Sequence, residues 1–436
     1  MKLKKILLLI LILFQSIQLI SSEIWSARYG GSRLDVGKTL FVNDDNSVVI
    51  AGWTNSPEKR SSDFADNNDI YVVKLDKDGN LLWELSLGGT KEDIINSMDK
   101  CSNGGYIFTG YSGSIEEPLN AKGSRDLLLF KVNEDGKLVW CKSYGGKYFE
   151  EGNKIICTKN GGFIVAGISS SSNGDIAKNY KNSRDIWIVK FDISGSIEWQ
   201  STYGGSMDDW AIDMIETFDG NYLILGNTSS FDYDLEDVKE DRNQDVILIK
   251  IDPYGNKLWQ KVYQANGIEY AQKLYETKDS SILFSVQTDS DEGLFNERKG
   301  GKYDVGLVKT DYIGEVIWSK VYGGNGVDGG GEICEDLQNN IHLSFISNSV
   351  DGDINKNNGF YDIVLFKLDT EGSIISKKII GGNDFESIND AKIKNNQLIL
   401  VGYTQSIFKN GISIKDQLYT GKGSADIWLI KKRIED

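Results

Sequence analysis

One stretch of the chain begins Trp140-Cys-Lys-Ser-Tyr-Gly-Gly146 and reaches Asp185-Ile-Trp-Ile-Val-Lys190. Between these ends lie two strand-like runs, Lys154-Ile-Ile-Cys-Thr158 and Phe163-Ile-Val-Ala-Gly167, joined by the turn sequence Asn160-Gly-Gly162. Short apolar or alternating runs that are bounded by Gly and Asn are typical of β-strands. The stretch therefore predicts four short strands, and none of its segments has the period of a helix.

The same stretch recurs along the whole chain. Its Trp-x-x-x-Tyr-Gly-Gly segment, or a close relative, starts at Trp25, Trp83, Trp140, Trp199, Trp259 and Trp318, and a degenerate copy starts at Ser376. The spacing is roughly 57 to 60 residues, which is in the range of solenoids and propellers. Four antiparallel strands per repeat are the composition of a propeller blade. The sequence therefore predicts an all-β fold, a seven-bladed β-propeller with four-stranded antiparallel blades.

The two ends of the chain indicate how the ring closes. The repeat begins with the Trp25-led strand and ends with Asp426-Ile-Trp-Leu-Ile-Lys431, so the last blade lacks its fourth strand. Pairing of the N-terminal strand with the last blade removes both open sheet edges, which would otherwise invite aggregation. We therefore expect one propeller domain over residues 23–436.

The repeat resembles a known family. Its pattern is Tyr-Gly-Gly-x₃-Asp, then Gly-Gly-Tyr-Ile-x-x-Gly-x-x-x-Ser, then Asp-x-x-x-x-Lys-x-Asp-x-x-Gly-x-x-x-Trp. This is similar to the bacterial seven-bladed propeller repeat (the SBBP repeat), and the resemblance covers residues 24–432. Such repeats occur in secreted and cell-surface proteins, and the resemblance implies an architecture rather than a function. The fifth copy departs by having Gln264-Ala265 in place of Gly-Gly, and the seventh lacks the Trp.

The N-terminus predicts export. Lys2, Lys4 and Lys5 precede the apolar run 6–14, and small and polar residues follow up to Ser22. This is the pattern of a secretory signal peptide, predicted here over residues 1–22, and the apolar run is shorter than the about 20 residues of a membrane span. An uncleaved anchor is the alternative. No later segment is apolar enough to cross a membrane, so we expect a secreted, periplasmic or cell-surface protein.

Composition excludes several classes of function. The net charge of −16 repels phosphate backbones, so nucleic acid and anionic membranes are not expected partners. The single histidine, His342, rules out multi-histidine metal centres, and no Gly-x-Ser-x-Gly nucleophile motif is present. Catalysis by two carboxylates, as in glycosidases, is not excluded. Four cysteines, Cys101, Cys141, Cys157 and Cys334, permit three disulfide pairings, or none, and the sequence does not choose among them.

Three charged positions recur in all seven copies. The first is a carboxylate four residues after the Gly-Gly: Asp35, Asp93, Glu150, Asp209, Glu269, Asp328 and Glu386. We expect these residues in loops near one mouth of the channel. The favoured interpretation is structural, because a residue that recurs in every blade performs the same task in every blade. The alternative is a cation site, with Ca²⁺ as the candidate ion, formed together with Asp175, Asp351 and Asp353 of two Asp-rich loops.

The other two recurrent positions belong to the third strand of each copy. An Asp opens this strand, and a Lys follows five residues later at Lys74, Lys131, Lys190, Lys250, Lys309, Lys367 and Lys431. We expect these lysines to lay their alkyl stems along buried surface and to keep their charges at the rim. The recurrent Trp residues are interpreted as packing between blades, and an exposed sugar-binding row is the alternative.

We expect a non-catalytic binding module that recognises an extracellular or envelope protein or glycan through one loop face, and a monomer without a bound cofactor. The loop 405–425 is the longest between second and third strands, and it carries Lys409, Lys415 and Lys422 with few acids. These lysines are therefore the candidate partner site. The alternatives are a carbohydrate-active propeller enzyme that uses paired carboxylates, and an envelope-assembly scaffold.

Overall fold

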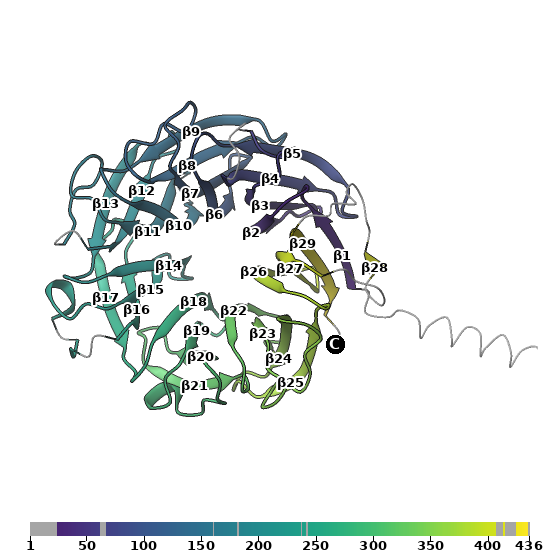
Figure 1. Cartoon of the computed structure of the whole chain (residues 1–436). Helices are drawn as coiled ribbons and strands as arrows, with labels where there is room; N and C mark the ends of the chain where they lie inside the picture. The colour runs from purple at the N-terminus through teal and green to yellow at the C-terminus, as the bar shows by residue number, and fades with distance from the viewer. Residues whose placement is uncertain are drawn as a thin grey trace, which may run out of the picture.

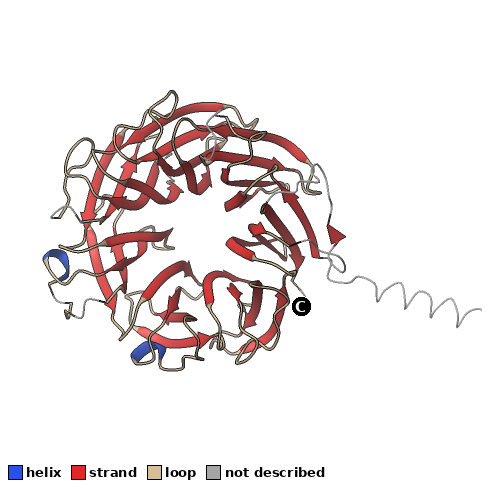
Figure 2. Cartoon of the chain, viewed as in Figure 1, coloured by secondary structure: helices blue, strands red, loops and turns tan. Residues whose placement is uncertain are grey.

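The computed structural model describes residues 24–61, 67–159, 161–180, 183–236, 238–240, 243–406, 413–414 and 424–434. Within these ranges the chain forms seven separate β-sheets that stand around a central channel (Figure 1). Strands account for almost all of the regular structure, and two short 3₁₀ turns, η1 (Tyr233–Leu235) and η2 (Gly293–Phe295), lie at the periphery (Figure 2). The chain is thus the seven-bladed β-propeller that the repeats predict.

Every blade follows the same order from the channel outward. The inner strands are β2 (Asp35–Val42), β6 (Asp93–Lys100), β10 (Glu150–Cys157), β14 (Asp209–Glu216), β18 (Glu269–Glu276), β22 (Asp328–Glu335) and β26 (Glu386–Lys394). The second strands are β3 (Val48–Thr54), β7 (Tyr106–Ser112), β11 (Phe163–Ser169), β15 (Tyr222–Thr228), β19 (Ile282–Thr288), β23 (Ile341–Ser347) and β27 (Gln397–Thr404).

The outer half of each blade completes the sheet. The third strands are β4 (Asp69–Leu75), β8 (Asp126–Val132), β12 (Asp185–Phe191), β16 (Asp245–Ile251), β20 (Asp304–Thr310), β24 (Asp362–Leu368) and β29 (Asp426–Arg433). The outer strands are β5 (Leu81–Leu87), β9 (Leu138–Tyr144), β13 (Ile197–Tyr203), β17 (Lys257–Tyr263), β21 (Val316–Tyr322), β25 (Ile374–Ile380) and β1 (Ile24–Tyr29). Blades are numbered from the one that begins with β2, and the two-residue strand β28 (Ser413–Ile414) flanks β1 in blade 7.

The N-terminal strand closes the ring. β1 is antiparallel to β29, with a register that runs from Ile24 opposite Lys432 to Tyr29 opposite Ile427. Blade 7 therefore takes three strands from the C-terminal end of the chain and its outer strand from the N-terminal end. The predicted closure is confirmed.

The core lies between blades rather than within one central layer. The third strands are apolar on both faces, and in β8, β12, β16 and β20 every residue is buried. Each hydrophobic cluster joins residues of neighbouring sheets, as where Ile70 and Val72 of β4 pack with Phe108 and Phe130 of blade 2. Since each sheet buries both faces, the continuous apolar runs of the sequence are explained.

A recurrent contact fastens most of the outer strands to the next blade. Trp259 of β17 packs on Gly314 in the turn between the third and outer strands of blade 5. The hydroxyl of Tyr263 on the same strand donates to the carbonyl oxygen of Gly314 at 2.8 Å. Equivalent Trp contacts occur on Gly136, Gly195, Gly255 and Gly372. We call this pair of contacts the turn clamp. The Trp contacts confirm the packing between blades for Trp83, Trp140, Trp199, Trp259 and Trp318.

Candidate functional site: the channel rim

The seven recurrent carboxylates that begin the inner strands are completely buried, each with 0% exposure. Asp35 shows the arrangement: it accepts hydrogen bonds from the backbone N–H of Gly31 at 2.7 Å and from the hydroxyl of Ser56 at 2.9 Å. A third bond comes from the hydroxyl of Thr54. Asp93 accepts from Gly89, Ser112 and Ser114 in the same way. In blades 1 and 2 the carboxylate thus ties the Gly-Gly loop before its strand to the end of the second strand.

These carboxylates lie beside the Asp that opens the third strand of the preceding blade. A Cβ on Gly323, the first Gly of its loop, would collide with both Asp304 and Asp328, so only glycine fits between the two acids. Burial, and to a smaller extent the charge of Asp209, raises the pKa of Asp185 to about 7. Burial also raises the pKa of Asp209 to about 6. The loop glycine and the two acids therefore form one repeated inter-blade unit.

The loop acids bind backbone groups of the neighbouring Gly-Gly loops. Asp175 accepts from the N–H of Gly145 at 2.9 Å and pairs with Lys122 at 2.6 Å. Asp351 accepts from the N–H of Asn325 at 2.7 Å. Asp353 accepts from the N–H of Gly323 at 3.3 Å. Among the residues that the structure describes, no three His, Cys, Asp or Glu side chains are grouped to hold a metal ion.

The recurrent lysines bind at the opposite end of the blades. Lys250 Nζ lies 2.7 Å from Asp219, and Lys309 Nζ lies 3.1 Å from Asp279, in the turns between first and second strands. Lys431 donates to the carbonyl oxygens of Asn46 and Lys77 in blade 1 at 3.3 Å. Their stems are buried as predicted, and their charges tie down turns.

A second ring of positions varies from blade to blade. The backbone carbonyl before each third strand accepts a hydrogen bond of 2.6 to 3.0 Å from the N–H of the buried carboxylate residue in the next blade. Because that acceptor sits beside the first residue of an inner strand, these positions surround one end of the channel. We call them the rim ring: Asn68, Arg125, Arg184, Gln244, Tyr303, Tyr361 and Ala425. The backbone hydrogen bond is the same in all seven blades, whereas the residue type at this position differs between blades.

Two neighbouring members of the rim ring are arginines. Arg125 Nη2 lies 2.8 Å from Glu92, and its guanidinium lies over the Tyr111 ring, 4.5 Å from the centroid. Arg184 Nη2 lies 2.6 Å from Asp208, and its guanidinium is 5.3 Å from the centroid of an indole ring, that of Trp210. The Arg125 and Arg184 side chains remain 41% and 51% exposed. Carboxylates and rings hold both guanidinium groups in place without covering them.

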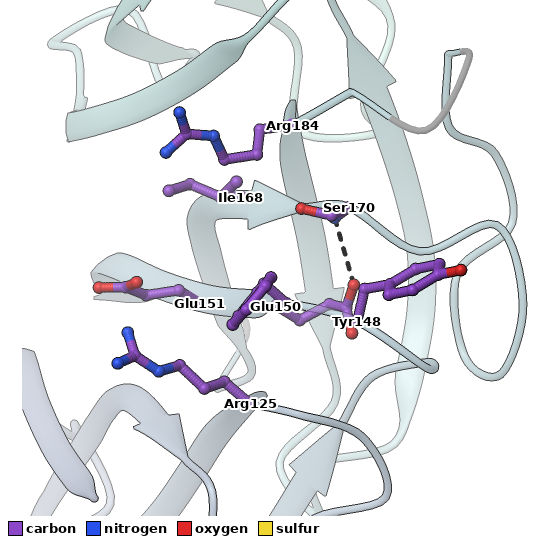
Figure 3. Close-up of a pocket in the computed structure, with 8 residues that line it drawn as sticks. Arg125, Tyr148, Glu150, Glu151, Ile168, Ser170 and Arg184 are labelled. Atoms are coloured by element: carbon purple, nitrogen blue, oxygen red, sulfur yellow. Dashed lines mark hydrogen bonds between the residues drawn. The ribbon is translucent and has the colours of Figure 1, made fainter.

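A cavity of about 510 Å³ lies between these arginines. Arg125, Glu151, Ile168 and Arg184 point to the same side, while the Tyr148 side chain points away (Figure 3). The Ser170 N–H donates to the Phe149 carbonyl oxygen at 2.8 Å and fixes the cavity wall (Figure 3).

Two residues of the inner strand β10 with carboxyl groups, Glu150 and Glu151, line this cavity, and Glu151 is the one that points to the side of the arginines (Figure 3). Its Oε1 accepts a hydrogen bond from Asn96 Nδ2 at 2.7 Å. Burial raises the pKa of Glu151, and the charges of Arg125 and Lys38 oppose that rise. The cavity therefore combines two cationic groups with one carboxyl group that is easier to protonate than usual.

The rim of blades 5 to 7 is aromatic instead. Tyr303 meets Tyr270 edge-on at 5.9 Å between ring centroids. Tyr361 lies 4.9 Å from Phe385, which stacks on Tyr403 at 5.7 Å. The rim ring thus has an arginine side and an aromatic side.

Charged side chains meet inside the channel. Lys273 of blade 5 lies within 3.0 Å of Glu332, 3.4 Å of Asp390 and 3.9 Å of Asp213, which belong to blades 6, 7 and 4. Lys154 and Lys392 complete the cluster by pairing with Asp213 and Asp390, each at 3.0 Å. Only the channel is shared by so many blades, so three lysines and three acids meet there.

A β-bulge in every inner strand precedes the position from which the acids and two of the lysines, Lys154 and Lys273, project. Bulges re-aim side chains in this way. Despite burial, the three carboxylates raise the pKa of Lys273, so this ammonium remains charged.

The other candidates have mixed outcomes. Lys409, Lys415 and Lys422 lie outside the described residues, as does the predicted signal peptide. The sulfur atoms of Cys101 and Cys157 are 3.3 Å apart, whereas Cys141 and Cys334 lie in other hydrophobic clusters. No helix within the described ranges is long and apolar enough to cross a membrane.

No family model and no curated protein sequence matches the chain. Several solved structures are similar to it. The WD40 domain of Pan2 from Neurospora crassa has a TM-score of 0.51 and 9% identity, with 96% of this chain and 98% of that chain covered. Hydrazine synthase from Kuenenia stuttgartiensis also has a TM-score of 0.51, with 11% identity and coverage of 84% and 93%. At such low identity these likenesses show the propeller fold alone.

The arginine pair and the channel cluster were not among the residues singled out from the sequence. Arg125 and Arg184 each precede the Asp of a third strand, where Asn68, Gln244, Tyr303, Tyr361 and Ala425 stand in the other copies. Comparison of copies at that one position would have shown that it varies while its neighbour does not.

Proposed function

We propose that the protein is a binding module that engages an extracellular or envelope partner, a protein or a glycan, at the rim ring. The observation that carries this proposal is a sevenfold backbone arrangement at the rim that holds side chains of very different chemistry. Residues that repeat in every blade serve the fold, whereas recognition of one partner needs an asymmetric surface.

The chemistry of the rim suits recognition. Arginine and large aromatic side chains dominate the energetically important positions of interfaces. A guanidinium that is already stacked on an aromatic ring loses little further freedom on binding, and its planar donors match a carboxylate or paired hydroxyl groups. Exposed apolar side chains lie in the loops of this face, with Phe149 50% exposed and Phe360 69% exposed.

A carbohydrate-active enzyme is the second candidate, and Glu151 is the observation that favours it. Its carboxyl group faces the 510 Å³ cavity with a raised pKa, as a general acid requires. Glycoside hydrolysis needs a second carboxyl group on the same substrate. The paired acids between blades do not offer one, because they are buried beneath the Gly-Gly loops.

Affinity capture tests the proposal. The tagged chain 23–436 is used as bait in envelope and environmental extracts, with and without Ca²⁺, beside the double variant Arg125→Ala/Arg184→Ala. Arg33→Ala is the matched control, because Arg33 is an exposed arginine in the corresponding loop face of blade 1. We expect one partner to be recovered by wild type and control and lost by the double variant.

Equal recovery by the double variant would place the binding surface elsewhere. No recovery in either condition would contradict the proposal. Cleavage of a polysaccharide from a test panel, abolished by Glu151→Gln, would establish the enzyme instead. Loss of the partner on chelation alone would assign the acidic loops a calcium-dependent role.

A further inference from the structure

The interface between blades 6 and 7 lacks the turn clamp. Ser376 of β25 stands where the other outer strands have Trp, and Ile380 stands where all of them except β5, which has Leu87, have Tyr. The turn that would receive them is missing too, because the outer strand of blade 7 is β1, which comes from the other end of the chain. Among the residues that the structure describes, no contact equivalent to that between Trp259 and Gly314 is formed at this position.

A cavity of about 330 Å³ occupies the place of the clamp. Its wall from blade 6 includes His342, Lys367, Ser376 and Lys378, and its wall from blade 7 includes Lys432 with Leu398 and Ile434. It lies near the ends of the blades that are opposite the rim ring, since His342 follows the turn between the first and second strands.

Two further departures from the repeat point into the same cavity. His342 lies opposite the recurrent lysine of the third strand, Lys367. In the other blades the residue opposite that lysine is aliphatic: Val49, Ile107, Ile164, Leu223, Leu283 and Ile399. Lys432 follows that lysine directly, where Leu75, Val132, Phe191, Ile251, Thr310 and Leu368 stand in the other blades. Three independent departures, at positions 342, 376 and 432, therefore converge on one gap.

Among the described residues that line the gap, the charged side chains are lysines. Asp336 is an acid beside it, and its carboxylate already binds Lys367 at 3.3 Å and His342 Nε2 at 3.1 Å. Burial lowers the pKa of His342, Asp336 opposes this, and the charges of Lys367 and Lys432 lower it further. Lys378 adds another ammonium group. This is a cationic pocket in a chain whose net charge is −16.

We propose that this pocket binds the phosphate or sulfate group of a small ligand. Lysine ammonium groups bind such oxyanions as point charges. Lys367, Lys378 and Lys432 line this pocket together with a buried imidazole. The His342 residue is only 9% exposed, so its ring is held in one position rather than sampling solvent. The volume is at the lower end of ligand pockets, about 300 to 1,000 Å³, which suits a phosphate ester of a small molecule rather than a polymer.

Lys378 has a matched control elsewhere in the ring. Its counterpart in blade 2 is Lys142, whose Nζ binds the carbonyl oxygen of Ser194 in the turn of the next blade at 2.8 Å. Blade 7 has no such turn, so Lys378 faces the pocket instead. The same residue type on the same strand position thus has a structural partner in one blade and a cavity in another.

The only histidine provides the readout. Imidazole resonances of His342 are followed by NMR in the full mature chain during titration with inorganic phosphate and, separately, with sulfate. Sodium chloride at the same ionic strength is the control. We expect a saturable shift with phosphate or sulfate and a rise in the pKa of His342, because a bound anion stabilises the imidazolium. The stronger of the two anions identifies the ligand group.

Three variants complete the test. Lys378→Ala is expected to weaken binding about tenfold, the loss of one charge-assisted hydrogen bond, while Lys142→Ala leaves it unchanged. Ser376→Trp restores the side chain of the other blades and should abolish binding, with thermal melting showing that the ring is intact. An equal shift with chloride, or equal affinity in Lys378→Ala and wild type, would overturn the proposal.

Discussion

The interfaces between blades 4 and 5 and between blades 6 and 7 are built from corresponding strands but are filled differently. At the first, Trp259 and Tyr263 hold the turn at Gly314, and Lys261 pairs with Glu315 of the same turn. At the second, the turn is absent, and a cavity with lysines and a histidine takes its place. The paired carboxylates are kept at both. The comparison teaches that repeated residues maintain the ring, and that the departures at positions 342, 376 and 432 lie together where the turn clamp is not formed.

The largest expected effect is the pH dependence of stability, which tests the buried carboxylates that both interfaces share. Burial raises the pKa of Asp93, Asp209 and Asp304 to about 6, and of Asp185 and Glu269 to about 7. An acid with a raised pKa in the folded state holds its proton more tightly there than in the unfolded chain. Its contribution to the free energy of unfolding is therefore complete below the unfolded pKa of about 4 and is lost as pH rises through 6 to 7. We expect the free energy of unfolding to fall by several kcal/mol, roughly 3 or more, from pH 5 to pH 8.

Melting temperatures from pH 3 to pH 9 check this expectation. Hydrogen bonds from His342 and Asn340 outweigh the effect of burial and lower the pKa of Asp336 to about 2. Since protonation of Asp336 breaks this stabilisation, the free energy of unfolding should fall again below about pH 4. Asp209→Asn should reduce the loss between pH 5 and pH 8. A stability maximum at pH 8 or above would contradict the carboxylate assignment.

The next effect separates the two interfaces. Trp259→Ala should lower the free energy of unfolding by about 3 kcal/mol, the lower end for a Trp-to-Ala change because the indole is partly exposed. Ser376→Ala, at the same position between blades 6 and 7, should change it by less than about 0.5 kcal/mol. Urea unfolding measures both. Similar losses in the two variants would show that the interfaces are not different in energy.

A smaller effect is expected within one carboxylate unit. Asp209→Ala removes the acceptor for the Gly205 N–H and the Ser230 hydroxyl, both bound at 2.8 Å. Buried donors without acceptors cost about 1 to 3 kcal/mol, so we expect a loss of roughly 2 kcal/mol. Asp209→Asn keeps an acceptor oxygen and should lose less at pH 8. If both variants melted alike, the hydrogen bonds would not be the reason for the repeat of this acid.

The smallest effect concerns the departure itself. His342→Leu restores the aliphatic residue of the other blades, while Asp336 keeps Lys367 and Asn340 as partners. We therefore expect a change in unfolding free energy of less than about 1 kcal/mol in either direction. Urea unfolding again provides the measurement. A loss above that level would mean that His342 supports the blade, and that its difference from Ile399 is structural.

The fold could be predicted because the repeat states it many times over. Strand runs such as Phe163–Gly167, the Trp-led outer strands and the unpaired ends at Trp25 and Lys431 are local signals that the sequence carries directly. The sequence predicts that the recurrent carboxylates lie near the channel mouth, but it does not predict that they are buried. The sequence does not show that the hydroxyls of Thr54 and Ser56 turn toward Asp35 and bury it.

The rim and the channel were harder for a physical reason. Arg184 meets Asp208 and Trp210, and Lys273 meets Asp390, across blades whose positions depend on ring geometry. The bulge that directs Lys273 into the channel arises from sheet pairing and has no residue signature of its own. Contacts of this kind follow from the assembled ring and not from any one copy of the repeat.

The outer strand of blade 7 has a consequence for the order of events during synthesis. Ile24 of β1 lies opposite Lys432 of β29, so β1 is made long before the strand with which it pairs. Contacts between residues so distant along the chain form slowly, because the entropy of closing a very long loop is lost before the contacts can stabilise the structure. Until then the edge of β29 is open, and newly made molecules are expected to depend on protection of that edge against pairing with one another.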